Sequence, residues 1–590
     1  MLSSSCSLTE IQRRIDEVTQ FLSVTLSIAN AHTVEFYTHD VWDRFMAVPP
    51  EDVLQAVSAT RDQQGAPQHK EKEQSSTMFG FCKETKQLVD IHELLLTAKS
   101  LSLPGLEVCL SRDELLQTFR ENMSESGTPP AEAGAEFETD EFMNSKKSHE
   151  VQSMSEVVAC LAKYCGVKQV IDVGSGKGYL SSFLSLHYGL GVYGIDSSSI
   201  NTRGAQERNR KLKKFSRAYQ KHSRTAKAQG EATQPRLADF QTQTGADGDD
   251  GVLCGGAAGI PPQEEERAPI SLTGLSPAVE HQSEPEELFL SSLAADAMQT
   301  TPPRIPPSQL SAEERERRKR ENLERKALSR SKGGGAVFSP LTSYVTAETE
   351  LRELINGLED AVMVGLHTCG DLAPSTLRMF VARPELAAVC SVGCCYHLLS
   401  EEFDPAAQEA SHSACGFPLS QHLRDQSWFC GRNARMSACL ALERVSLGQG
   451  IQMESLFYRA VLHVILRDHY GSHKSEKRVG NVYSKAESFV DYVRRALRRL
   501  DLDEWKLSDG DIQHYHDAYR PRMGEMHAFN LLKVTLAPCI EGLILLDRLC
   551  FLKEQEDVPF SALVQLFDPL LSPRCYAVVG LKPHTNSTRS

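Results

Sequence analysis

The sequence predicts an α/β protein with a doubly wound, largely parallel sheet, a helical N-terminal region and a long insertion. Short apolar runs alternate with stretches of helical spacing, which is the pattern of parallel strands joined by crossover helices. A glycine-rich turn follows one of these runs, and the next run ends in an acidic residue. Strand, turn, helix and acid-tipped strand are the usual layout of a site for a nucleoside-bearing ligand.

Length and composition set the outer limits of the prediction. A chain of 590 residues is too long for one compact domain and suggests two or three, and its 41% hydrophobic content supports a sizeable core. The net charge of −14 argues against a protein that coats nucleic acid. Sixteen cysteines without a repeated spacing suggest reduced thiols, so we expect an intracellular protein, cytoplasmic or nuclear. The start of the chain lacks the features of a signal peptide, and the apolar stretch 539–552 is too short and too charged to span a membrane.

Composition also suggests how the chain is divided. Residues 1–120 form a helical N-terminal region, since apolar residues recur at helical spacing over 11–28 and 90–101, with Phe36, Tyr37, Trp42 and Phe45 in a small core. A linker over 121–142 leads to the first part of the sheet domain at 143–221. Residues 222–339 are polar and rich in proline and glycine, so we expect a disordered insertion. Within it, 312–332 alternates acids and bases, as in a solvated charged helix or a nucleic-acid contact. The second part of the domain occupies 340–590.

The expected elements of the sheet domain follow in chain order. Helices are predicted over 179–188 and 345–358. Strands are predicted over 167–173, 192–196, 361–366, 386–392, 541–546 and 575–579.

The glycine turn has the spacing Asp172-x-Gly-x-Gly-x-Gly178. Without β-carbons the backbone can turn tightly and a ligand can approach main-chain N–H groups. About twenty residues later, Asp196 ends the second strand, where a carboxylate can accept hydrogen bonds from ribose hydroxyls.

Three kinds of ligand-binding motif share glycine-rich turns of this type. A nucleotide P-loop is excluded, because position 171 is Ile and Lys177 is followed by Gly rather than Ser or Thr. A dinucleotide fingerprint is weakened but stays open, because Tyr179 stands where its third glycine belongs. The spacing, with Asp196, favours S-adenosylmethionine. A glycine-rich corner that binds no ligand is the remaining alternative.

Three further clusters are candidates for chemistry. His367-Thr-Cys-Gly-Asp371 follows one strand and Gly393-Cys-Cys-Tyr-His397 follows the next, so both should line the ligand crevice. For Asp371, capping of the next helix is favoured over catalysis. Lys146-Lys-Ser-His-Glu150 precedes the first helix of the domain and offers two bases, an imidazole and a carboxylate.

The cysteines in these clusters allow two alternatives to pocket lining. Cys394, Cys395 and His397, with Cys369 or His367, are ligand types found in tetrahedral zinc sites. Adjacent cysteines rarely ligate one zinc together, and no Cys-x-x-Cys pair supports them, so we assign no metal. A cysteine nucleophile that attacks a base is the other alternative, but the proline-cysteine motif of such enzymes is absent.

Several motifs together resemble the methyltransferase-like protein 25 family. They are Lys-Lys-x-His-Glu-Val at 146–151, Asp-Val-Gly-Ser-Gly-Lys-Gly-Tyr-Leu-Ser at 172–181, Gly-Ile-Asp-Ser at 194–197, Glu-Arg-Asn-Arg-Lys-Leu-Lys-Lys at 207–214, Leu-His-Thr-Cys-Gly-Asp-Leu at 366–372 and Val-Gly-Cys-Cys-Tyr-His at 392–397. The resemblance implies a Rossmann-like class I fold and S-adenosylmethionine-dependent methyl transfer. The place of the usual adenine N6 motif reads His-Thr-Cys-Gly-Asp, which argues against that chemistry.

The predicted function is therefore methyl transfer from S-adenosylmethionine to an RNA or protein acceptor, without a membrane partner. The alternative is a non-catalytic protein that binds the cofactor or other partners through this fold. Cofactor binding is assigned to Asp172, Gly174, Ser175, Gly176, Lys177, Gly178 and Asp196. His367 and His397 are the catalytic candidates. The acceptor-side candidates are Lys147, Glu150, Cys394, Cys395 and Tyr396.

Overall fold

The structure is a computed structural model. It describes residues 6–62, 90–124, 143–212, 338–405, 415–440, 453–471, 479–480 and 482–583, all of which belong to one compact unit formed by Met1–Lys221 and Gly335–Ser590. Most of the expected linker and insertion, including the expected charged helix at 312–332, lies outside these residues.

The centre of the fold is an eight-stranded mixed sheet with the strand order β1-β7-β8-β6-β5-β2-β3-β4. All neighbouring strands are parallel except β8, which runs antiparallel to both β6 and β7. The strands are β1 (Cys109–Ser111), β2 (Gln169–Val173), β3 (Gly191–Asp196), β4 (Phe338–Thr342), β5 (Ala361–Cys369), β6 (Leu386–Cys394), β7 (Phe560–Gln565) and β8 (Tyr576–Leu581). The predicted fold class is confirmed.

Helices cover both faces of this sheet because successive strand residues point to opposite sides. Val170 and Val364 pack with α6 (Arg112–Ser124), α7 (Ser145–Tyr164) and α8 (Tyr179–His187). Ile171 and Met363 instead join a core with α13 (Leu372–Ala382) and α20 (Met523–Lys553). Residues 199–212 form a further helix after β3. The predicted helix over 179–188 is confirmed as α8.

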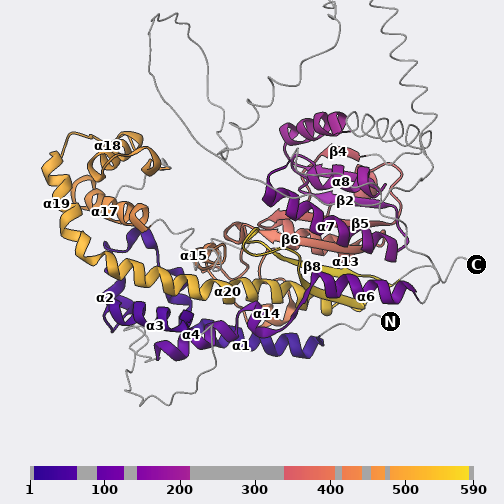
Figure 1. The fold of residues 1–590 in the computed structure, drawn as a ribbon, viewed down its shortest axis with the longest axis horizontal. Helices are drawn as coiled ribbons and strands as arrows, with labels where there is room; N and C mark the ends of the chain where they lie inside the picture. Colours follow the sequence, from indigo (N-terminus) through magenta and orange to yellow (C-terminus); the bar gives the residue numbers. More distant parts are fainter. Residues whose placement is uncertain are drawn as a thin grey trace, which may run out of the picture. The chain divides into compact units, whose positions relative to one another are not determined.

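The N-terminal helices pack on α20 rather than forming a separate body. Figure 1 shows α20 alongside α1 (Leu8–Asn30), α3 (Pro50–Asp62) and α4 (Ile91–Ser100). The predicted helices over 11–28 and 90–101 are confirmed. Phe36, Tyr37, Trp42 and Phe45 are buried as expected, but the ring of Phe529 from α20 joins them. Strand β1, which pairs with β7, ties this region to the sheet.

The remaining described helices lie between β1 and β7 in the chain or within the N-terminal region. They are α2 (Val41–Phe45), α5 (Leu103–Leu106), α12 (Leu351–Leu354), α14 (Gln421–Asp425), α15 (Arg432–Ser437), α17 (Met453–Tyr470), α18 (Phe489–Arg499) and α19 (Asp509–Tyr519). Among the described residues, one helical stretch, 509–553, is long and apolar enough to cross a membrane, but 83% of its most apolar window is buried within the protein. Packing therefore accounts for its apolar composition.

Two predicted elements are wrong, and three strands were not predicted. The expected strand over 541–546 lies inside α20, where nearly every residue is buried, so its apolar run reflects a core helix. The expected helix over 345–358 is reduced to α12. The unpredicted strands are β1, β4 and β7, and β4 begins at Phe338, within the expected insertion.

Candidate functional site

The glycine turn connects β2 to α8 through left-handed backbone conformations. Gly174, Gly176 and Gly178 have φ values of +72°, +53° and +69°, a region that other residues rarely adopt. The N–H groups of Gly174 and Ser175 donate to the carbonyl of Ile195, at 2.9 and 3.0 Å, which binds the turn to the tip of β3. At Gly178 a β-carbon would lie only 2.8 Å from the Phe338 ring of β4, so no side chain fits.

Asp196 faces this turn from the end of β3. Its Oδ2 accepts from the Gly176 N–H at 2.9 Å, and its Oδ1 accepts from the Ser198 N–H at 2.8 Å and the Asn201 amide at 3.1 Å. A carboxylate has about four acceptor positions, so these bonds orient it and leave capacity for a further donor. Ser175 and Lys177 are half-buried between the glycines.

Asp172 lies beneath the turn. It is 1% exposed, and its Oδ2 accepts a 2.5 Å hydrogen bond from the Ser181 hydroxyl in the first turns of α8. Burial raises the pKa of this carboxyl to about 7; the Ser181 hydrogen bond opposes the shift, and the charge of Asp196 adds to it. Asp172 therefore supports the turn from beneath, through its hydrogen bond with Ser181 of α8.

Glu150 of α7 is the buried centre of a polar cluster at the carboxyl ends of the strands. Its Oε2 accepts from Lys147 Nζ at 2.8 Å and lies 3.1 Å from His367 Nε2, while its Oε1 accepts from the Ser572 hydroxyl at 2.7 Å. Burial alone would raise the pKa of Glu150. The hydrogen bond and charge of His367, with those of Lys147, outweigh burial and hold this pKa well below its usual range. The structure thus brings together three predicted site residues.

His367 has a left-handed backbone conformation at a bulge in β5. Its φ is +66°, and the register of β5 with β6 shifts between Leu366 and Thr368. A non-glycine residue in this region costs free energy, which the surrounding structure has to offset. The bulge turns the imidazole from β5 towards Glu150 on α7.

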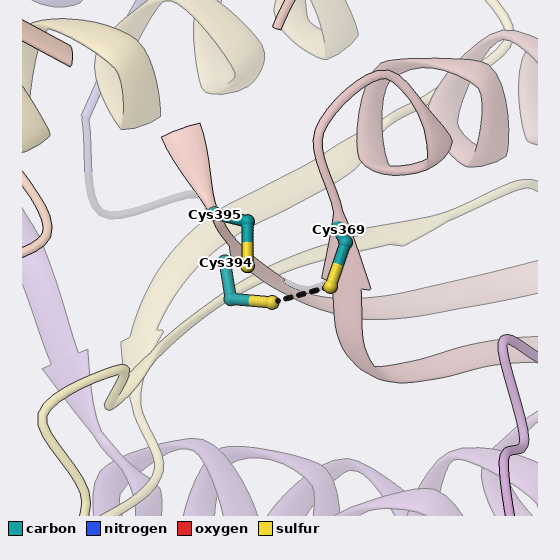
Figure 2. A group of neighbouring side chains, drawn as sticks. All are labelled: Cys369, Cys394 and Cys395. Carbon is teal, nitrogen blue, oxygen red and sulfur yellow. Dashed lines mark hydrogen bonds between the residues drawn. The ribbon is translucent and has the colours of Figure 1, made fainter. Parts of the chain in front are cut away.

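Three cysteine thiols converge at the ends of β5 and β6 (Figure 2). Cys369 ends β5 and Cys394 ends β6, with their sulfur atoms 3.1 Å apart, and the sulfur of Cys395 lies within 4.8 Å of both. Hydrogen bonds from Cys369 and Cys394 lower the pKa of Cys395, and the charges of His397 and His367 add to this effect against its burial. Hydrogen bonds with Cys369 and Cys395 have the opposite effect on Cys394 and raise its pKa.

Tyr396 and His397, which follow Cys395 in the chain, make contacts outside the group of three cysteines. Tyr396 is 1% exposed, and its hydroxyl donates to Glu541 in α20 at 2.8 Å, so it supports the core and does not face an acceptor. His397 is half-buried, with its Nδ1 3.8 Å from the Cys439 sulfur. Asp371 precedes α13 as expected, but its carboxylate accepts from the Ser400 N–H at 2.8 Å instead of capping the helix.

Sequence reasoning missed the supporting residues Ser181, Asn201 and Ser572. Ser181 and Asn201 follow their acidic partners by nine and five residues, so their spacing was a usable signal. Ser572 follows β7, a strand that was not predicted, and no local pattern marks it as a partner of Glu150.

This sheet order, glycine turn and acid-tipped strand define an α/β protein of the methyltransferase class. A family model described as "Methyltransferase domain" matches residues 146–402, which include the turn, Asp196 and the three cysteines. The chain is 46% identical to "Probable methyltransferase-like protein 25" of Homo sapiens over 605 residues, covering 97% of both chains. It is 47% identical to the protein of that name from Mus musculus over 591 residues, covering 96% of both. The chain therefore belongs to the methyltransferase-like protein 25 family. No solved structure gives a significant match.

Proposed function

We propose that this protein binds S-adenosylmethionine at the glycine turn and transfers its methyl group to an RNA or protein acceptor. The observation that carries the proposal is the meeting of the turn and Asp196 at the carboxyl edge of β2 and β3. Ligands of doubly wound sheets bind at this edge, where the strand order changes direction; here β2 has β3 on one side and β5 on the other.

The residues at the turn fit such a cofactor. Residues 174–177 are half-buried, and Gly174 and Gly176 carry no β-carbon, so an adenosine-containing ligand can approach their main chain closely. Asp196 retains acceptor capacity for ribose hydroxyls. The Ser175 hydroxyl is buried without a hydrogen-bond partner among the described residues, which is expected of a group that a ligand satisfies.

When bound, the cofactor supplies a methyl group already activated by a positive sulfur. The protein then has to align the acceptor and, where the acceptor carries a proton, remove it. Glu150, held as a carboxylate by Lys147 and Ser572, fixes the Nε2–H of His367. With Nε2–H directed at Glu150, Nδ1 is the ring nitrogen that can exchange a proton with the acceptor, so we assign proton handling to His367 and its positioning to Glu150.

The experiment is radiolabelled methyl transfer into an extract of cells that lack the protein. Wild-type protein and Asp196→Ala are incubated with labelled S-adenosylmethionine, and RNase-treated and protease-treated fractions are compared. We expect label above the Asp196→Ala background. Loss of the label with RNase identifies RNA as the acceptor, and loss with protease identifies protein. Equal label with both proteins contradicts methyl transfer and favours an interaction protein with this fold.

A further inference from the structure

The cysteine cluster is formed by the sheet itself. Cys369 and Cys394 are register partners at the carboxyl ends of the parallel strands β5 and β6, so pairing of these strands places their side chains together. Their sulfur atoms lie 3.1 Å apart, and all three cysteine sulfurs lie within 4.8 Å of one another. Sulfurs that share a tetrahedral zinc ion are about 3.8 Å apart, since each Zn–S bond is about 2.3 Å. The cluster needs only small shifts to reach that spacing.

The backbone removes the objection that adjacent cysteines do not share a metal. In an extended strand, successive side chains point to opposite faces, so the thiols of Cys394 and Cys395 would diverge. Cys395 is instead in the left-handed region, with a φ of +50°, immediately after the last residue of β6. Figure 2 shows the result: Cys395 and Cys394 present their sulfurs on the same side, towards Cys369.

The surroundings of the cluster suit a negatively charged group rather than an apolar one. Cys369 is exposed, so hydrophobic packing does not explain the gathering of three thiols. The buried guanidinium of Arg548 lies against Gly393, where a β-carbon would be 2.2 Å from its Nη1, so only glycine leaves room for it beside Cys394. Its Nη2 has no hydrogen-bond partner among the described residues. A buried cation with an unsatisfied hydrogen-bond donor favours negative charge nearby.

We propose that Cys369, Cys394 and Cys395 bind one Zn²⁺ ion through their thiolates. Three thiolates and Zn²⁺ carry a net charge of −1, which the guanidinium of Arg548 balances. Thiolates select zinc over magnesium and calcium, which prefer oxygen ligands. The fourth position is left to an imidazole or to water. His397, two residues after Cys395, is the candidate imidazole, because Glu150 holds His367 for the proposed methyl transfer. The site is independent of the proposed methyl transfer.

A disulfide between Cys369 and Cys394 is the competing explanation of their short separation. It would consume two of the three ligands and leave Cys395 as a single thiol, so it is incompatible with the zinc site. Peptide mapping under non-reducing conditions distinguishes the two. A Cys369–Cys394 cross-linked peptide in freshly purified protein would overturn the proposal.

The test measures metal in full-length protein purified without added chelator. Elemental analysis of wild type should give about one zinc per chain, as for a single tetrahedral site. After removal of the zinc, binding of Co²⁺ should produce a thiolate-to-cobalt charge-transfer band. Cys395→Ser should lose most of the zinc and most of this band. Cys160→Ser, on α7 and away from the cluster, is the matched control and should keep both.

Two further results would overturn the proposal. One is wild-type protein that contains no zinc and gives no cobalt band. The other is Cys395→Ser that keeps both signals at the wild-type level. Circular dichroism shows whether each variant folds, and Cys369→Ser, at an exposed position, provides a second variant if Cys395→Ser does not. Binding of S-adenosylmethionine by the same preparations is measured separately, so that failure of the zinc site and failure of the cofactor site are distinguishable.

Discussion

Replacing Gly178 by Ala tests whether the glycine turn packs against β4 as the structure shows. Gly178 has a φ of +69°, and its added β-carbon would lie 2.8 Å from Cζ of Phe338 and 3.0 Å from the β-carbon of Ala205. The left-handed backbone costs a non-glycine residue roughly 1–2 kcal/mol. Overpacking a rigid neighbour adds roughly 1–3 kcal/mol. We therefore expect a loss of about 2–5 kcal/mol in the free energy of unfolding.

Gly189→Ala is the matched control. Gly189 has a φ of +70° but no atom within 4 Å of the added β-carbon. It shares the backbone cost and the change in the unfolded chain, so the difference between the variants isolates the contact with Phe338. Urea unfolding followed by circular dichroism should place Gly178→Ala about 1–3 kcal/mol below Gly189→Ala. Equal losses in the two variants would refute this packing.

The remaining predictions concern three side chains at or near the site. Glu150→Gln should lower the methyl-transfer rate about 10²–10⁴-fold, because His367 loses its charged partner, while calorimetry should show almost unchanged S-adenosylmethionine affinity; an unchanged rate would exclude the role given to Glu150. Asp172 has a pKa raised from 3.8 to about 7, so its contribution to stability is present below about pH 4 and is lost as the pH rises towards 7. Asp172→Asn should therefore reduce the fall in unfolding free energy between pH 4 and 7 by up to about 4 kcal/mol, and urea titrations with the same pH slope in both proteins would contradict this. Tyr396→Phe removes the donor to Glu541 and should cost about 1–2 kcal/mol of unfolding free energy without changing cofactor binding; a change in methyl transfer at unchanged stability would instead favour an acceptor-side role.

Local patterns predicted that the glycine turn meets Asp196. The turn at 174–178 and the acid at 196 lie within one strand–helix–strand unit, so their spacing alone predicts that they meet. The polar cluster around Glu150 is harder to predict from the sequence. Lys147 and Glu150 were named as candidates, and so was His367, but their pairing depends on how α7 crosses the end of β5.

Errors arose where packing overrides local pattern. The run 541–546 is equally apolar in a buried strand and in a buried helix, and only its place in α20 decides between them. The backbone conformation of Cys395 decides whether adjacent thiols diverge or meet, and the sequence of a Cys-Cys pair does not specify it. Tyr396 was expected to face the acceptor from its position after a strand, but its ring packs under Arg548 and Arg574 instead.

Calorimetric binding of S-adenosylmethionine to wild type and to Asp196→Ala tests the central claim most directly. Hydrogen bonds to a charged group are worth about 1.5–3 kcal/mol, so loss of the Asp196 carboxylate should weaken binding about 10- to 150-fold. Circular dichroism on both proteins provides the folding control. Measurable binding by wild type and a loss of this size in the folded variant are the predicted result. No binding by folded wild type, or equal binding by both proteins, would contradict the assignment of the glycine turn and Asp196 to the cofactor.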